Sequence, residues 1–217
     1  MEVNKLKKKD YLWLTTLAVI VIFLIVPYTR ELFEQVTKTH PYIMGFIKFA
    51  ILATMGELLT IRIVNKKWIK PVGLIYRIII WGFLGVVITL VFDLFNSGVE
   101  QLLIKGKLPG QSSGLTLAFF TSFLMNLIFA PTMMAFHSIT DSYIDLKFAK
   151  TKSNLNIKQA VINIDWGHFV SFVVLKTIPI FWIPAHTITF LLPETYRIIT
   201  AAFLSLALGA ILAFANK

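Results

Sequence analysis

Six separate apolar runs, each near the length of a helix that crosses a bilayer, divide this chain of 217 residues. They cover residues 11–28, 42–64, 72–95, 115 to about 139, 169–192 and 195–215. A helix needs about 20 apolar residues to cross the hydrocarbon core, and only structures that satisfy their own backbone hydrogen bonds are stable there. The sequence therefore predicts an all-α fold, a polytopic transmembrane helix bundle of about six spans, with no room for a soluble catalytic domain.

Composition agrees with a membrane protein and excludes several functions. Hydrophobic residues make up 57% of the chain and charged residues 15%, and the mean hydropathy of +0.76 is too high for a domain whose main solvent is water. The absence of cysteine excludes disulfides, thiolate nucleophiles and thiolate zinc sites. The net charge of +10 comes from short lysine runs beside apolar segments rather than from one basic face, so we expect no nucleic-acid partner.

The placement of the basic residues predicts the orientation. If six helices cross, both termini lie on one side of the membrane. That side would hold the lysines of the basic segment 1–10, Lys66, Lys67, Lys70, Lys147, Lys150, Lys152, Lys158 and Lys217. The other side would hold Arg30, Lys38, Lys105, Lys107 and Arg197. Because loops rich in Lys and Arg stay in the cytoplasm, we predict cytoplasmic termini, in the cytoplasmic (inner) membrane of a bacterium.

Two segments leave a five-span alternative open. The run 11–28 follows a basic segment as a signal peptide would, but it lacks small residues at a cleavage site, so it is interpreted as an uncleaved additional helix. It could also lie partly outside the bundle. The fifth run contains Pro179 and Pro184 and ends at Pro193, where it forms a hairpin with the sixth, so it could fail to cross fully. Residues 154–167 resemble an interfacial helix.

Ionisable residues inside these runs indicate where function is to be sought, because a charge at bilayer depth costs several kcal/mol. Glu57 and Lys176 lie well inside their runs and each needs a partner, water or a shifted pKa. Arg62, Arg77 and Asp93 lie near the ends of theirs and are interpreted as snorkelling to the headgroups.

The fourth run carries polar residues near multiples of a helical turn, among them Asn126, His137 and Asp141, and Pro131 interrupts this stripe. His137 and Asp141 stand four residues apart, a spacing that can share a metal, but without a third ligand we predict a hydrogen-bonded pair and no metal. In the fifth run, Trp182 and His186 flank Pro184 away from any predicted interface. Small residues such as Gly56, Gly82 and Gly85 predict close helix packing.

Several short motifs resemble the Mpv/peroxisomal membrane protein family. They are His40-Pro41, Met55-Gly56-Glu57, Phe129-Ala130-Pro131, Phe190, Leu192-Pro193 and Tyr196-Arg197. Trp182-Ile183-Pro184 differs from the family's Trp-Pro by one extra residue between the two. The resemblance covers residues 40–217, with 11–28 additional to the family core, and His186 and Thr189 stand where the family has Gln and Asn. Members of this family are small helical proteins of peroxisomal and mitochondrial inner membranes, with bacterial relatives. The resemblance therefore implies a small helical membrane protein of the bacterial type with a pore-like or solute-transport role.

The predicted function is a channel or transporter for small hydrophilic solutes. Its polar path would include Glu57, Asn126, His137, Lys176, Trp182, His186 and Arg197. The motif residues Gly56, Pro131, Pro184, Phe190 and Pro193 are assigned structural roles. The alternative is a non-conducting scaffold or homo-oligomer whose polar groups form interhelical hydrogen bonds. No nucleophile–base motif or metal triad is present, so we predict neither enzymatic activity nor a cofactor.

Overall fold

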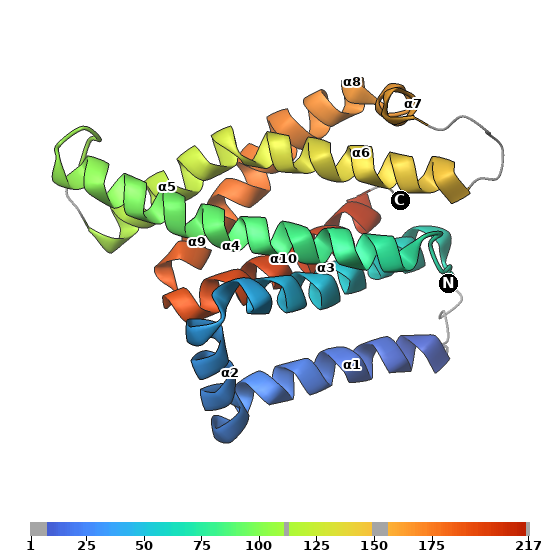
Figure 1. The fold of residues 1–217 in the computed structure, drawn as a ribbon, viewed down its shortest axis with the longest axis horizontal. Helices are drawn as coiled ribbons and strands as arrows, with labels where there is room; N and C mark the ends of the chain where they lie inside the picture. Colours follow the sequence, from blue (N-terminus) through green and yellow to red (C-terminus); the bar gives the residue numbers. More distant parts are fainter. Residues whose placement is uncertain (1–7, 111–112, 149–155, 216–217) are drawn as a thin grey trace.

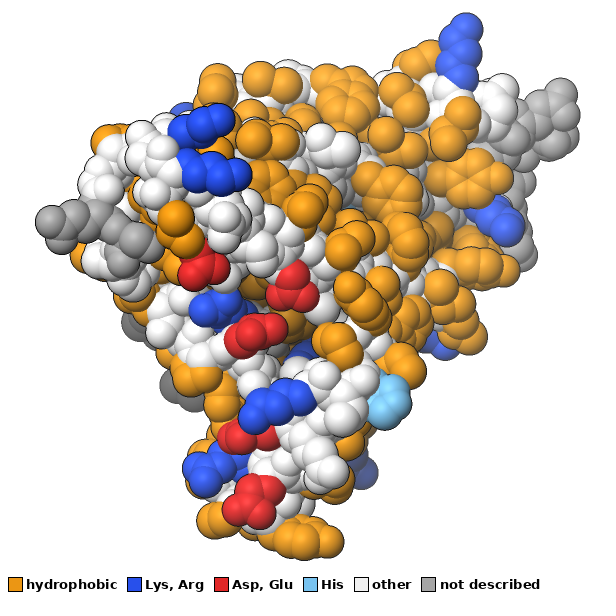
Figure 2. Space-filling view, turned by 60° about the vertical axis from the view of Figure 1, so that its left-hand side comes forward, with side chains coloured by type: hydrophobic (Ala, Val, Ile, Leu, Met, Phe, Trp, Pro, Cys, Tyr) orange, Lys and Arg blue, Asp and Glu red, His pale blue; other side chains and the backbone are white. Residues whose placement is uncertain are grey.

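The computed structural model describes residues 8–110, 113–148 and 156–215, and within these ranges it is a bundle of helices without a strand (Figure 1). The predicted all-α fold is confirmed. Most of the predicted basic segment 1–10, together with Lys150, Lys152 and Lys217, lies outside the described residues. Figure 2 shows a broad apolar surface over the upper and right-hand parts of the view, as expected for helices that contact lipid. The acidic side chains in view gather toward the left and bottom, and basic side chains lie there and at the right-hand edge.

The first apolar run ends in a sharp corner rather than continuing as one rod. Helix α1 (Lys8–Ile25) meets α2 (Pro27–Thr39) at 85°. Pro27 lacks an N–H and has a fixed φ, so it ends the preceding hydrogen-bond ladder and starts α2. Helix α2 buries Phe33 and Thr37 against Lys48, whose Nζ donates to Thr37 Oγ1 at 3.1 Å and lies 4.6 Å from the Phe33 ring centroid. No helix was predicted from the sequence for most of this amphipathic segment, since the first apolar run ends at residue 28.

Three long helices form the centre of the bundle. Helix α3 (Pro41–Asn65) packs between α4 (Leu74–Ile104) and α10 (Glu194–Ala215). Glycine makes both contacts close: a Cβ on Gly85 would lie 2.7 Å from Phe49 Cβ, and a Cβ on Gly56 would lie 3.1 Å from the Ser205 carbonyl. The predicted role of small residues in helix packing is therefore confirmed at these two positions. Helix α4 has 31 residues, about 46 Å by its rise per residue, so it is longer than the hydrocarbon core is thick.

The fourth and fifth apolar runs are irregular. Helices α5 (Gly114–Ile128) and α6 (Ala130–Phe148) meet at a 44° bend just before Pro131, where the sequence predicted an interruption. The second helix continues to Phe148, so the predicted end near residue 139 is wrong. The fifth run continues through α8 (Trp166–His168), the π-helix η1 (Phe169–Trp182) and α9 (Ile183–Leu191). The wider π-helical turn accommodates Pro179, which cannot donate to an α-helical ladder. The short α7 (Ile157–Ile162) packs against α6 within the segment predicted to be interfacial.

By length and composition, the described chain has four helices able to cross a membrane: α3, α4, residues 166–191 and α10. The number rises to six if the bent pairs α1–α2 and α5–α6 each count as one span. In the five-span alternative the fifth run would not cross fully, but residues 166–191 are long and apolar enough to cross a membrane. Figure 1 shows that the start of α1 and the end of α10 lie at the same end of the bundle. Which side of the membrane that end faces stays a prediction.

The close approach of α3 and α4 generates a first prediction. Gly85→Ala places a Cβ against Phe49 and the Gly45 backbone and should destabilise the protein by about 1–3 kcal/mol through overpacking. Gly98→Ala on the same helix is the control, because its Cβ would meet no atom within 4 Å. It should be neutral or stabilising by about 0.5–1 kcal/mol, since alanine is the better helix former. Thermal unfolding in detergent measures both, and equal melting temperatures would contradict the tight packing.

Candidate functional site: a cavity between the helices

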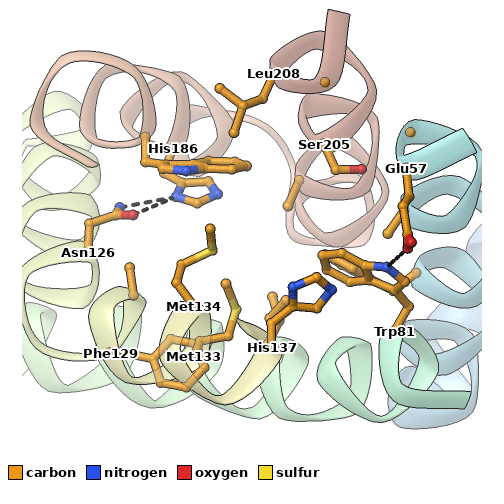
Figure 3. Close-up of a pocket in the computed structure, with 18 of the residues that line it drawn as sticks. Glu57, Trp81, Asn126, Phe129, Met133, Met134, His137, His186, Ser205 and Leu208 are labelled. Carbon is orange, nitrogen blue, oxygen red and sulfur yellow. Dashed lines mark hydrogen bonds between the residues drawn. The ribbon is translucent and has the colours of Figure 1, made fainter. Parts of the chain in front are cut away.

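A cavity of about 370 Å³ lies between α3, α4, α5, α6, α9 and α10, with Trp182 of η1 in its wall (Figure 3). Most of its lining is apolar. The larger aliphatic, methionine and phenylalanine side chains are Phe49, Ile61, Ile88, Phe92, Met125, Phe129, Met133, Met134 and Leu208. This volume is within the range of small-molecule sites, about 300–1,000 Å³, which are likewise mostly apolar with a few placed polar groups. The polar groups here form two clusters.

The first cluster joins α5 to α9. Asn126 is fully buried, and its amide nitrogen donates to the Ser122 carbonyl at 2.8 Å. His186 Nδ1 lies 3.1 Å from the Asn126 nitrogen and 3.2 Å from its oxygen, so one of the two hydrogen bonds forms according to the imidazole tautomer. The Ser122 hydroxyl donates to the Ile183 carbonyl at 2.7 Å. The His186 ring stacks on Trp182 at 5.1 Å between centroids, so this wall of the cavity is fixed on several sides.

The second cluster, from α3, α4 and α6, includes Glu57 at the cavity wall. Its carboxylate accepts from Trp81 Nε1 at 3.2 Å and from Arg77 Nη1 at 3.0 Å. The Trp81 ring lies 4.2 Å from the ring of His137, which lines the same wall. Figure 3 shows the Trp81 and His137 rings side by side, with Glu57 above Trp81. The Glu57 side chain is 18% exposed, so it is held by its partners while an edge stays accessible.

Arg77 is the centre of this second cluster. Its side chain is 6% exposed and forms ion pairs with Glu57, with Asp141 at 2.9 Å and with Asp145 at 2.6 Å. Its Nε also donates to the Val72 carbonyl at 3.2 Å. The prediction that Arg77 snorkels to the headgroups is therefore wrong: it is buried among carboxylates from two other helices. Asp141 also approaches His137, 3.6 Å from its Nδ1, so the predicted pairing of these two residues belongs to a larger cluster.

Arg62 also differs from the snorkelling interpretation. It is 12% exposed and forms a two-point pair with Asp10, with nitrogen–oxygen distances of 2.8 and 3.2 Å. Trp68 Nε1 donates to the same carboxylate at 2.9 Å. These bonds attach the start of α1 to the end of α3. Asp93 is exposed, but α4 continues to Ile104, so its placement near a helix end is also wrong.

Five of the seven residues predicted for a polar path line the cavity: Glu57, Asn126, His137, Trp182 and His186. Lys176 and Arg197 do not. Lys176 is exposed on η1, with no ion pair or hydrogen bond to any described residue. Arg197 donates to the Leu192 carbonyl at 3.1 Å and lies over the Phe190 ring.

The five predicted motif residues have the structural positions expected of packing and turn residues. Gly56 lines the cavity beside Ser205, and Phe190 is buried against Phe92. Pro131 and Pro184 lie in the first turns of α6 and α9, and Pro193 separates α9 from α10. Of the five, Gly56 lines the cavity, and the structural roles assigned to all five stay predictions.

Sequence reasoning missed the grouping of Arg77, Trp81 and Asp145 with Glu57. A signal was present, because Arg77 and Trp81 stand four residues apart, as do Asp141 and Asp145, so each pair shares a helix face. The spacing alone does not reveal which faces meet.

Fold and cavity together define the class: a polytopic helical membrane protein with an internal cavity of ligand size. No family model, curated protein or solved structure matches the chain. Membership of the Mpv/peroxisomal membrane protein family therefore stays a prediction from the motifs. Within the described residues, no group of three or more His, Asp or Glu side chains is arranged to hold a metal ion.

Replacing Arg77 tests how much the ion-pair cluster around it contributes to the free energy of unfolding. Arg77→Met leaves three carboxylates without their shared cation, and removing one partner of a buried pair costs about 3–5 kcal/mol. Arg30→Met is the matched control, since Arg30 is 46% exposed and its nearest contact to Glu34 is 3.9 Å. That change should cost at most about 1 kcal/mol. Denaturant titration of both variants in detergent checks the difference, and similar midpoints would mean that the Arg77 cluster is not a stabilising centre.

Proposed function

We propose that this protein is a membrane transporter of the carrier type, whose solute-binding site is the central cavity. One observation carries the proposal: a cavity of about 370 Å³ inside the bundle brings together polar residues from helices far apart in the sequence. Polar groups inside a membrane are costly, so they are usually retained for a function or for internal pairing. Here the two polar clusters do pair internally, and each also presents an edge to the cavity.

The apolar lining favours a carrier over a water-filled pore. A pore for hydrophilic solutes replaces their hydration with polar groups along the whole path. In this cavity, aromatic rings and methionines such as Phe49, Phe129 and Met133 make up most of the wall between the Asn126 and Glu57 clusters. The solute is therefore proposed to have an apolar body and one polar group. The proposed solute therefore differs from the small hydrophilic solutes expected from the sequence, because it also has an apolar part.

The interrupted helices around the cavity support a moving site. Helices α5 and α6 bend by 44° just before Pro131, and Phe129 and Ala130 at this bend line the cavity. The π-helix η1 contributes Trp182 at the point where it passes into α9. Broken helices next to a central site are a recurring feature of transporters, because they allow one part of the bundle to move against another. The role implied by the family resemblance points in the same direction.

The scaffold alternative has its own supporting observation. Arg77, Glu57 and the two aspartates are paired with one another, which is what interhelical hydrogen bonding in a closed bundle requires. A scaffold, however, gives no role to the cavity between these residues and Asn126. Solute movement across a membrane separates the two hypotheses.

Flux through reconstituted protein is the deciding measurement. Proteoliposomes are placed in tetraethylammonium, cyclohexanecarboxamide or pivalate, each an apolar body with one polar group, and osmotic swelling is followed against protein-free vesicles. We expect faster entry of at least one solute. Met134→Trp, which adds bulk at the cavity wall, should slow that entry by about tenfold or more, because a filled site cannot bind. Lys176→Met is the control, since Lys176 lies outside the cavity, and it should leave the rate unchanged.

Two outcomes would count against the carrier. Vesicles with verified insertion that swell no faster than empty ones would favour the scaffold. Entry that is insensitive to Met134→Trp would mean that the solute takes another route.

A further inference from the structure

We propose that the occupant of the cavity is a small organic cation with an apolar body, such as a substituted ammonium, an inference that rests on the function proposed above. Three features of the cavity wall support this inference. They are the sign of the charge that faces the cavity, the imbalance of charge behind the wall and the aromatic rings around the cavity.

The charge at the cavity wall is negative. Among the residues that line it, Glu57 carries the carboxylate, and neither lysine nor arginine is present in that lining. The two basic residues that the sequence placed on the path, Lys176 and Arg197, lie elsewhere. An anion would therefore meet a carboxylate without a basic side chain at the wall to attract it. An organic cation would meet an opposite charge in a medium of low dielectric constant, where that attraction is strong.

Behind the wall, acidic groups outnumber the basic group. Arg77 is shared by Glu57, Asp141 and Asp145, so three carboxylates face one guanidinium within 3.0 Å. If all three are ionised, the charges of this cluster sum to about −2. Arg77 thus neutralises Glu57 only in part, and a positive charge bound beside Glu57 would offset the remainder. Asp145 is 58% exposed, so water solvates its charge, and the imbalance next to the cavity is that of Glu57 and Asp141, which are 18% and 25% exposed and share one guanidinium. A buried carboxylate with too few cations gains a proton or binds a cation, and the cavity beside Glu57 supplies space for a cation.

Aromatic rings supply the rest of the site. The cavity is lined by the rings of Trp81, Trp182, Phe49, Phe92 and Phe129. Trp81 donates its N–H to Glu57, so one of these rings lies directly beside the carboxylate. The faces of aromatic rings attract ammonium groups that have lost their water, and cages of such rings recognise quaternary ammonium ligands. A carboxylate beside the edge of one aromatic ring, in a cavity lined by four further aromatic side chains, therefore matches a cation with an apolar body better than an inorganic ion.

Two other occupants fit the cavity less well. A neutral apolar molecule, or the tail of a lipid, could fill the apolar volume but would make no use of Glu57. An anion could reach Asn126 and His186, yet it would still share the cavity with a carboxylate. Both occupants become outcomes of the test, because molecules of one shape and different charge can be compared.

The test uses the full chain in lipid nanodiscs and three probes of nearly equal shape. Benzyltrimethylammonium is the cation, neopentylbenzene is its neutral counterpart and phenylmethanesulfonate is the anion. Equilibrium binding is measured with each, and protein-free nanodiscs correct for partition into lipid. We expect the cation to bind about tenfold more tightly than the neutral probe, as one opposite charge with cation–π contacts provides, and the anion to bind more weakly than both.

The variants locate the charge effect. Glu57→Gln keeps the shape and the hydrogen-bonding capacity of the side chain and should lower the affinity for the cation about tenfold while leaving the neutral probe unchanged. Glu100→Gln, which removes an exposed carboxylate from the same helix as Arg77, should change neither. Met134→Trp should weaken the cation and the neutral probe alike, because it reduces the space in the cavity. Gel filtration and thermal unfolding verify that each variant is folded.

The outcomes distinguish the inference from the proposed function. Equal affinity for the cation and the neutral probe, both lost in Met134→Trp, would overturn the cation inference while keeping the cavity as a binding site. Tighter binding of the anion would overturn it in the same way. If no probe binds above protein-free nanodiscs, the inference fails, and the swelling measurement decides the proposed function separately.

Discussion

The neutralisation of Arg77 is the interaction on which the interior of this bundle depends. A guanidinium that is 6% exposed within a membrane helix needs anionic partners, and it has three. Glu57 comes from α3, and Asp141 and Asp145 come from α6, so a single side chain of α4 fixes the positions of two other helices. The cost of an unpaired charge in hydrocarbon makes any arrangement that separates these helices unfavourable. The cluster therefore specifies which helix faces meet.

This arrangement also explains why a cavity persists nearby. Helix α6 is held to α4 by its aspartates, whereas α5 is held to α9 by Asn126, which lies 3.1 Å from His186. The 44° bend before Pro131 allows the two halves to satisfy these separate attachments. Polar bonds and apolar packing together set both positions, since Met125 of α5 and Phe190 of α9 also belong to the buried core. The space between the two clusters is lined by methionines and aromatic rings.

The sequence was sufficient for the features that depend on one helix at a time. Run lengths predicted the apolar helices, the cost of charge in hydrocarbon singled out Glu57, and the polar stripe of the fourth run singled out Asn126 and His137. All three line the cavity. The sequence was insufficient where the rotation of a helix about its axis decides the result. Lys176 lies deep in its run yet is exposed. It belongs to the π-helix η1, whose residues per turn differ from those of an α-helix, so an α-helical pattern could not show which side chains of this segment face the bundle. The prediction for Arg77 was wrong because its acidic partners come from other helices. The spacing of residues along one helix does not show which helices are neighbours in the bundle.

The stabilising and the binding interpretations of the acidic cluster are compatible. A closed ion-pair network would match one guanidinium with one carboxylate, or add a second cation, and would leave no charge to offset. Here one guanidinium serves three carboxylates, and of these only Glu57 also lines the cavity. The two aspartates share Arg77 with Glu57, so Arg77 keeps anionic partners on α6 when Glu57 also binds a solute. Glu57 is thus the carboxylate best placed to meet a solute, and it shares its role as a partner of Arg77 with two aspartates. The same cluster can therefore hold the helices together and form part of a binding site.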